Sequence, residues 1–191
     1  MKKVNVVFIL MIFAMSGCAL SPQIIEIDPV IQIDNALAEK PVRIRLDVVD
    51  ARNSEYIGKR GGIYKDTSDI STSKNMTSNL NHNLSKALNK LGYQVVNKGE
   101  SFDAELIVKI TSINYSAYTE KLLNKVDLKV AVDVVARKNS REFTGGFNAT
   151  RKKDYVKVPG VEENEKIVNE TIALVLENML KDKDLNNFIN G

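Results

Sequence analysis

Residues 125–150 read KVDLKVAVDVVARKNSREFTGGFNAT, and this stretch decides the fold. Apolar side chains fill every second position from Val126 to Val134. After residues 138–140 the alternation returns, with one face made of Phe143, Gly145, Phe147 and Ala149. A period of two is typical of a strand with one buried face. Because Lys-Asn-Ser at residues 138–140 suits a tight turn, the stretch predicts two antiparallel strands in succession.

A third long strand precedes these two. Residues 103–115 carry Leu106, Val108 and Ile110 on one face and Ile107 and Ile113 on the other. Strands that follow one another along the chain usually pair with each other. We therefore expect three antiparallel strands at the centre of the sheet.

Shorter strands are expected around this centre. Residues 42–48 alternate cleanly, and residues 93–96 form a short strand. Residues 24–29 are extended and apolar, but Pro29 cannot donate a ladder hydrogen bond, which favours an edge position. Residues 50–72 are polar and contain three glycines, and they indicate a long loop or a short irregular hairpin.

Two helices follow from the spacing of apolar residues. One begins at a cap, Thr72 or Ser73, and ends at Leu91, because Gly92 suits a left-handed C-terminal cap. The other covers residues 162–181 and is acidic at its start and basic at its end, as the helix dipole prefers. Residues 184–189 add one further helical turn.

These elements predict an α+β fold with a mainly antiparallel sheet of four to six strands and two helices packed on one face. The other face of the sheet is polar and available to a partner. We expect it to carry Arg43, Arg45, Lys109, Thr111, Lys129 and Asp133.

The N-terminus has the form of an export signal. Lys2 and Lys3 precede an apolar run that is too short for a permanent span of about 20 residues. The run ends in Met-Ser-Gly-Cys at residues 15–18, which resembles the lipobox of bacterial lipoproteins. We expect cleavage between Gly17 and Cys18 and acylation of Cys18, which would anchor the protein to a membrane.

The expected organisation is a signal peptide over residues 1–17, a lipidated tether over residues 18–23 and one periplasmic α+β domain over residues 24–191. Ala19 stands where an aspartate would signal inner-membrane retention in enteric-type bacteria. The predicted location is therefore the cell envelope, with the lipid anchor in the outer membrane and the domain facing the periplasm.

Composition excludes some classes of function. The 27 Lys and Arg residues include Lys2 and Lys3, so the exported part has 25 basic against 24 acidic residues. A near-neutral chain without a long basic cluster argues against nucleic acid as a partner. With one cysteine the chain has no internal disulfide, and no motif in it predicts a cofactor.

Patterns for catalysis are weak. His82 is the only histidine, and its spacing from the apolar stripe of its helix points it to solvent, so we expect no catalytic triad and no metal site. A cell-wall hydrolase that uses carboxylates alone stays open as an alternative. The visible carboxylate pairs lie at strand and helix ends, where solvation or capping accounts for them: Asp47 with Asp50, Glu162 with Glu163, and Asp182 with Asp184.

A candidate partner-binding loop lies within residues 50–72. It combines basic and aromatic side chains with glycines, and such a loop could contact an anionic partner such as peptidoglycan or lipid headgroups. The alternative is a solvated surface loop. The candidate residues are Arg52, Tyr56, Lys59, Arg60 and Tyr64.

Four segments occur in one order along the chain: the lipobox Cys18, Ile25-Glu26-Ile27-Asp28-Pro29, residues 84–95 with Leu91-Gly92-Tyr93, and the tail Asp184-Leu185-Asn186-Asn187-Phe188-Ile189. With these segments the chain resembles the YajG family of uncharacterised bacterial lipoproteins. The resemblance implies a lipid-anchored envelope protein without an assigned activity, and it supplies no catalytic residues.

The function that we expect is a non-enzymatic envelope lipoprotein, held to the membrane through Cys18 and binding an envelope protein or peptidoglycan. The carboxylate-dependent hydrolase is the alternative from another class. A structural homo-oligomer is a third.

Overall fold

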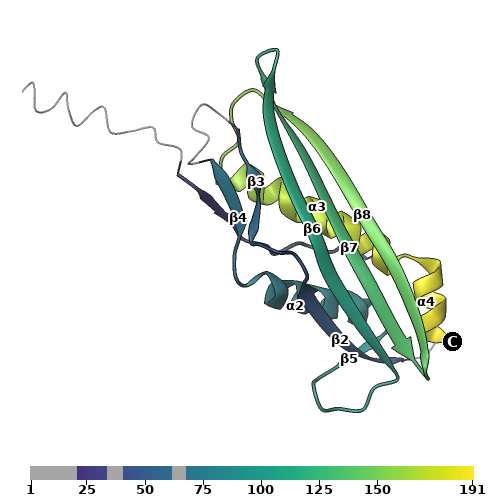
Figure 1. Ribbon diagram of the computed structural model, residues 1–191. Helices are drawn as coiled ribbons and strands as arrows, with labels where there is room; N and C mark the ends of the chain where they lie inside the picture. Colours follow the sequence, from purple (N-terminus) through teal and green to yellow (C-terminus); the bar gives the residue numbers. More distant parts are fainter. Residues whose placement is uncertain (1–20, 34–40, 62–67) are drawn as a thin grey trace, which may run out of the picture.

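The computed structural model describes residues 21–33, 41–61 and 68–191, and Figure 1 shows it as a ribbon. The elements in chain order are β1 (Gln23–Ile25), β2 (Arg43–Asp50), β3 (Tyr56–Lys59), β4 (Asp69–Thr72), α2 (Met76–Lys90), β5 (Gln94–Val96), β6 (Ala104–Glu120), β7 (Leu123–Lys138), β8 (Arg141–Tyr155), α3 (Val161–Leu180) and α4 (Lys183–Asn190).

The described strands form one mixed sheet around the three long strands. β6, β7 and β8 pair antiparallel in succession, as their alternation predicts. The other edge of β6 is shared, because β2 pairs parallel with its first half and β3 pairs parallel with Tyr115 and Ser116 near its end. β5 continues the sheet beyond β2, and β4 and then β1 continue it beyond β3.

The α+β class is therefore confirmed, but the prediction of four to six mainly antiparallel strands is wrong. Within the described residues the sheet has eight strands, and the pairs β1–β4, β2–β5, β2–β6 and β3–β6 are parallel. The connection from β2 to β5 runs through β3, β4 and α2, and a long crossover of this kind is what a parallel pair requires. Alternation along one strand carries no information on the direction of its neighbour, so the sequence pattern could not distinguish the two arrangements.

For residues 50–72 the sequence left open a long loop or a short irregular hairpin, and the described residues of this segment form the hairpin. β3 and β4 pair antiparallel with a register irregularity between Tyr56 and Gly58. Gly58 has φ +151°, and a Cβ there would lie 1.8 Å from the Tyr115 carbonyl oxygen. Only glycine therefore lets β3 approach β6 this closely.

A β-bulge in β6 changes which of its residues face the core. The register shifts between Ile110 and Ser112, so Ile113 and Tyr115 are buried on the same side as Leu106 and Val108. The expectation that Ile113 lies on the opposite face from Leu106 is thus wrong, because one extra residue inverts the alternation beyond it.

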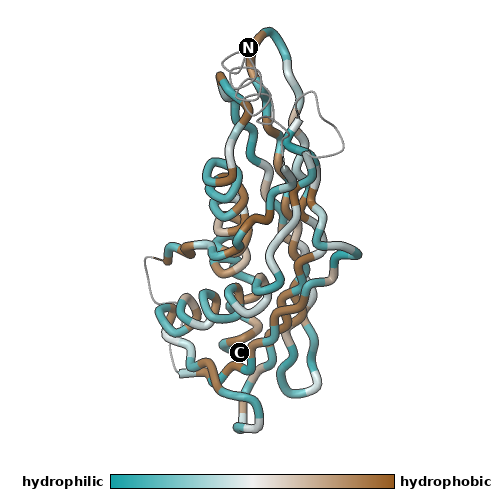
Figure 2. Tube along the Cα trace, turned by 90° about the vertical axis from the view of Figure 1, so that its left-hand side faces the viewer, coloured by the Kyte–Doolittle hydropathy of each residue, from teal (hydrophilic) through white to brown (hydrophobic). Residues whose placement is uncertain are grey.

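Helices cover one face of the sheet. α3 packs against β7 and β8, α2 packs against β2 and β5, and Figure 2 shows both helices on one side of the strands. The described core is one continuous apolar cluster between the layers. α2 begins after Asn75 rather than at Thr72 or Ser73, and it ends before Gly92, which has φ +94° as expected. None of the helices in the described ranges is long and apolar enough to cross a membrane.

Arg52 is a structural residue at the end of β2. Its side chain is 5% exposed and forms an ion pair with Asp50 at 2.8 Å. The same guanidinium donates to Thr72 Oγ1 at 2.8 Å. Burial opposes ionisation of Asp50, but the hydrogen bonds and charge of Arg52 outweigh it and hold the pKa of that carboxyl below its usual value. The pair therefore connects β2 to β4.

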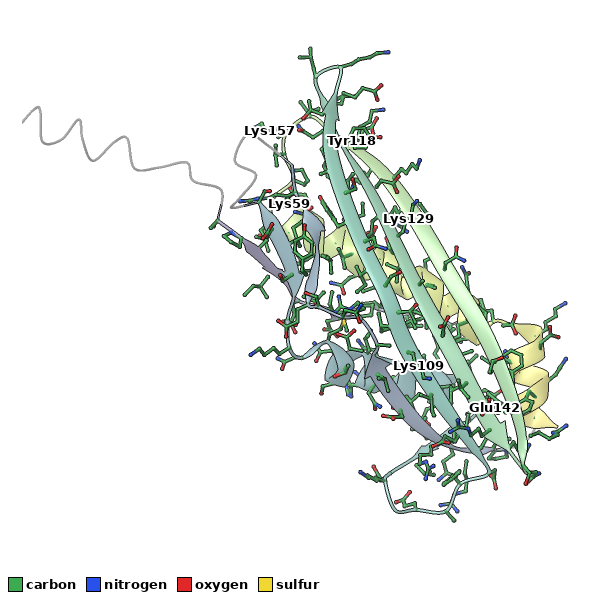
Figure 3. The ribbon with its side chains drawn as sticks, in the orientation of Figure 1. Lys59, Lys109, Tyr118, Lys129, Glu142 and Lys157 are labelled. Carbon is green, nitrogen blue, oxygen red and sulfur yellow. The ribbon has the colours of Figure 1, made fainter. Side chains whose placement is uncertain are left out.

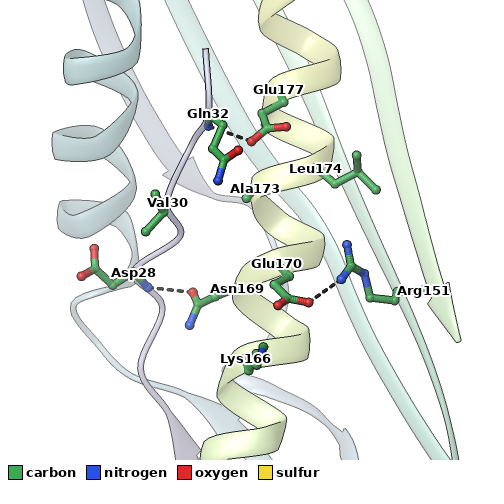
Figure 4. Close-up of a pocket in the computed structure, with 10 residues that line it drawn as sticks. All are labelled: Asp28, Val30, Gln32, Arg151, Lys166, Asn169, Glu170, Ala173, Leu174 and Glu177. Atoms are coloured by element: carbon green, nitrogen blue, oxygen red, sulfur yellow. Dashed lines mark hydrogen bonds and ion pairs between the residues drawn. The ribbon is translucent and has the colours of Figure 1, made fainter. Parts of the chain in front are cut away.

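Residues 26–33, which we call the strap, lie extended between α2 and α3 without pairing to a strand. Three side chains of α3 accept hydrogen bonds from strap N–H groups, and Figure 4 shows the two bonds at Asp28 and Gln32. Glu165 Oε1 accepts from Glu26 at 3.0 Å, Asn169 Oδ1 from Asp28 at 2.8 Å, and Glu177 Oε1 from Gln32 at 2.8 Å.

The spacing of these bonds has a geometric cause. Four residues of a helix advance about 6 Å and two residues of an extended chain advance about 6.6 Å, so the two series stay in step. The position of α3 between Asn169 and Glu177 is Ala173, which has no acceptor, and no such bond forms at Val30. On the other side of the strap, Asn79 and Asn83 of α2 donate to the carbonyls of Ile27 and Pro29 at 3.0 and 3.1 Å.

The Asn169 side chain pairs with the strap backbone through one accepted and one donated hydrogen bond, as a neighbouring strand would. Its amide accepts from Asp28 N–H and donates to the Glu26 carbonyl, both at 2.8 Å. Meanwhile Ile27 and Ile33 point into the core and are at most 2% exposed. The strap thus closes the cleft between the two helices.

Replacing Asp50 by Asn should lower the free energy of unfolding at pH 7 by about 2 kcal/mol, the order of a hydrogen bond to a charged group. Because the folded pKa of Asp50 is depressed, its contribution is complete above the unfolded pKa of about 4 and disappears as pH falls through the folded value. The deficit of Asp50→Asn should therefore shrink below about pH 4. Urea unfolding of both proteins at pH 7 and pH 3 measures this.

The matched control is Asp184→Asn, which removes an exposed carboxylate at the start of α4. Its effect at pH 7 should stay within about 0.5 kcal/mol. An Asp50→Asn deficit that is equal at both pH values would contradict the assigned role of the ion pair.

Replacing Asn169 by Leu should lower the free energy of unfolding by about 1–3 kcal/mol, because two backbone groups of the strap lose their partners. Lys166→Leu places the same side chain on an exposed position one turn earlier and should change stability by less than about 0.5 kcal/mol. Thermal or urea unfolding compares the two. Equal effects of the two substitutions would show that the amide does not hold the strap.

Candidate functional site on the open face of the sheet

The face of the sheet opposite the helices forms the candidate site. We call it the open face and define it by the outward residues of β2, β6, β7 and β8, which alternate with the buried row. Figure 3 shows Lys109 and Lys129 projecting from this side of the long strands. No helix within the described ranges packs on it.

Half-buried aliphatic side chains lie in the middle of the open face. Ile107 of β6 is opposite Val135 of β7, and Ala131 lies two rows further along β7, beyond the pair of Lys109 and Asp133. Next to them is a shallow hollow of about 330 Å³, which forms because the outward residue of β8 at this point is Gly146. A Cβ on Gly146 would lie 3.4 Å from Asp133 Oδ1.

Charged side chains surround this aliphatic centre. Both signs are represented equally among those nearest the centre, with Arg45, Lys109, Lys129, Arg137 and Lys152 basic and Asp47, Glu105, Asp127, Asp133 and Glu142 acidic. At one end Glu105 lies between two arginines, and Arg137 also bonds Glu142 at 2.8 Å. The hydrogen bond from Arg45, with help from Arg137, lowers the pKa of Glu105 below its usual value. The open face is therefore a neutral mosaic of alternating charge.

The polar residues that the sequence predicts for this face are partly found there. Arg45, Lys109, Lys129 and Asp133 lie on it, and Arg43 begins β2 with its guanidinium donating to Ser101 Oγ. Thr111 falls at the bulge of β6. The sequence pattern places Ile107 on the face away from Leu106, as found. Val135, Thr144 and Gly146 were not expected as part of the site, although the period of two in β7 and β8 gives their face.

The candidate loop is divided by the structure. Arg52 and Arg60 point inward, Arg52 to Asp50 and Arg60 to the Ser21 carbonyl at 2.7 Å, and Arg60 is 8% exposed. These two arginines therefore have partners within the fold and buried side chains, which differs from the exposed contact residues that the sequence predicts. Tyr56 is 45% exposed, and Lys59 lies 3.5 Å from Asp69. Tyr64 and Cys18 lie outside the described residues.

A second hollow of 360 Å³ lies between the strap and α3, as Figure 4 shows. Its polar side chains already serve the fold. Asn169 and Glu177 hold the strap, and Arg151 of β8 forms an ion pair with Glu170. The hollow is thus a consequence of the missing side chain at Ala173.

One member of each carboxylate pair expected from the sequence has a structural role. Asp50 holds Arg52, Glu163 accepts from the Gly160 N–H at 2.9 Å, and Asp182 accepts from the Leu185 N–H at 2.8 Å. His82 is exposed on α2. Across residues 21–33, 41–61 and 68–191, no three His, Cys, Asp or Glu side chains gather in a group that could hold a metal ion.

Comparison with solved structures finds several similar chains. The Xanthomonas campestris protein XCC0632 of family DUF330 is 12% identical with a TM-score of 0.56, and the match covers 86% of this chain and 96% of that one. A homolog of the neuraminyllactose-binding hemagglutinin from Helicobacter pylori is 13% identical with a TM-score of 0.46, covering 83% and 93%. Lipoprotein GNA1162 from Neisseria meningitidis is 12% identical with a TM-score of 0.33, covering 74% and 100%.

The match to XCC0632 is a likeness of fold alone at this identity. No curated protein matches the chain. A family model described as uncharacterized lipoprotein matches residues 29–190, which is most of the chain and includes residues 29–33 of the strap, the whole of β6 to β8, and α2, α3 and α4. The chain belongs to this family of uncharacterized lipoproteins.

Proposed function

We propose that the protein is a non-enzymatic, lipid-anchored module of the cell envelope that binds a protein partner on the open face of its sheet. The observation that carries the proposal is the open face itself. It combines a half-buried aliphatic centre with a border of alternating charges, and no helix in the described part of the chain covers it.

The charge pattern favours a protein over a polyanion as the partner. Nucleic acid and other polyanions are bound by surfaces of one sign, because attraction grows with the number of neutralised charges. A mosaic with equal numbers of both signs instead suits a surface with the complementary mosaic. The aliphatic centre supplies the apolar part that protein interfaces place inside a polar rim.

Membership of a lipoprotein family supports the anchor at Cys18. The narrower assignment to the YajG family, and the location in the outer membrane facing the periplasm, belong to the same proposal. They rest on the four segments that resemble that family and on Ala19 after the cysteine.

Replacing Cys18 by Ala should abolish acylation and release the protein from the membrane fraction. Metabolic labelling with a palmitate analogue, followed by density separation of the two membranes, measures both effects. The wild-type protein should carry label and sediment with the outer membrane, whereas Cys18→Ala should carry none. Label that persists in Cys18→Ala would refute the anchor, and a wild-type protein in the inner membrane would refute the location.

A photo-crosslinking residue at Asn148, exposed on β8 beside Ala131, should capture the protein partner in intact cells. Adding Thr144→Arg, opposite Val135, should reduce this capture by about tenfold or more, which corresponds to about 1.4 kcal/mol of binding free energy.

Ser78 on the exposed side of α2 is the matched control for this experiment. A crosslinking residue there should capture no partner, and Ser78→Arg should leave the capture at position 148 unchanged. Equal capture from both positions, or capture of peptidoglycan fragments instead of protein, would contradict the proposal.

A further inference from the structure

One end of the molecule carries exposed apolar side chains that the fold does not require. Leu122, in the turn between β6 and β7, is 91% exposed, and Val156, directly after β8, is 81% exposed. The two segments are neighbours, because Asn124 pairs with Tyr155. Tyr118 and Lys157 lie at the same end in Figure 3. We call this set the tip: Tyr118, Lys121, Leu122, Val156 and Lys157.

The turn at the tip differs from its counterpart at the opposite end of β7. Both turns have two successive residues with positive φ, 47° and 69° at Lys121 and Leu122, and 49° and 61° at Asn139 and Ser140. Such turns favour Asn, Asp and Gly, and the far turn has a polar pair that suits this conformation. A leucine in the left-handed region with its side chain in solvent therefore has no explanation in the turn.

The tip lies on the side from which the anchor leaves. The Ser21 carbonyl accepts from Arg60, and the neighbouring Gly61 lies beside Ala117 of β6. Cys18 is three residues before Ser21, a reach of at most about 10 Å. From Ala117, β6 continues for three residues to Glu120, also about 10 Å. The acyl chains and the turn can therefore reach one membrane surface together.

The charges around the tip suit phospholipid headgroups. Glu120 and Asp154 both engage Lys125, at 3.0 and 3.8 Å. Lys121, Lys153 and Lys157 are exposed outside that cluster, and Lys153 lies over the ring of Tyr155. Glu162 and Glu163 begin α3 nearby, and Glu163 is turned back to the Gly160 N–H. Lysine stems beside exposed aliphatic side chains are typical of segments that lie in a bilayer interface.

We propose that the tip docks into the headgroup region of the phospholipid bilayer that holds the anchor, with Leu122 and Val156 inserted and the lysines at the phosphates. The proposal rests on the acylated Cys18 of the proposed function. Docking at a second site fixes the orientation of the domain, so that the open face stands at a set angle to the membrane.

Leu122→Trp tests the proposal directly, because the chain contains no other tryptophan. The acylated full-length mature protein is reconstituted in vesicles of phosphatidylethanolamine and phosphatidylglycerol. The tryptophan emission should shift to shorter wavelength relative to that of the same variant without the acyl anchor in buffer. The emission should be quenched when the lipids carry brominated acyl chains. Ser140→Trp, the equivalent position of the far turn, should show neither effect.

Flotation of the same vesicles separates the docking from the anchor. If the protein floats while Leu122→Trp emits as in water and resists quenching, the docking is refuted and the anchor stands. A shift to shorter wavelength without quenching would place the tip against protein and also refute the docking. Protein that does not float would refute the anchor and the docking that depends on it.

Discussion

The single extra residue at Thr111 keeps the buried face of β6 on one side along its whole length. The part of the sheet around β2 and the part around β3 therefore share one core. β6 is long enough to carry two different neighbours on one edge, and its buried face must stay on the same side along the whole length. Without the bulge, Ile113 and Tyr115 would face solvent. Tyr115 would then lose its 2.7 Å hydrogen bond to Asn164, which in turn donates to Gln23. β1 and the start of α3 would lose their polar connection to the sheet.

The hydrogen bonds from Tyr115 through Asn164 to Gln23 are buried, so losing either partner would leave a polar group without a partner inside the core. Burial raises the pKa of Tyr115 well above its ordinary value, so the hydroxyl stays protonated and continues to donate. Asn164 is fully buried and uses both its oxygen and its nitrogen in the chain of bonds. A buried amide that satisfies two partners contributes to a unique arrangement, since any shift of α3 would leave polar groups without partners.

Prediction from sequence succeeded where one element decides its own conformation. The alternation of β7 and β8, the apolar stripe of α3 and the positive φ of Gly92 are local properties, and each is confirmed. Prediction from sequence failed where a conformation depends on contacts between segments that are distant in the chain. The direction of β2 relative to β6, the bulge at Thr111 and the inward position of Arg52 depend on partners that are remote in the chain. The open face lies between these cases, because its strands were predicted but its aliphatic centre depends on the register between them.

The strap determines how the domain responds to a pull on its N-terminus. A load applied at Ser21 runs along residues 26–33, parallel to α3, and the bonds from Glu165, Asn169 and Glu177 stand across that direction. They are therefore loaded in shear and must break together, whereas bonds loaded by peeling break one at a time. Tension between a membrane and this fold would first load the short ladder between β1 and β4 and then the bonds between the strap and α3, and the long strands would keep their shape while these bonds last.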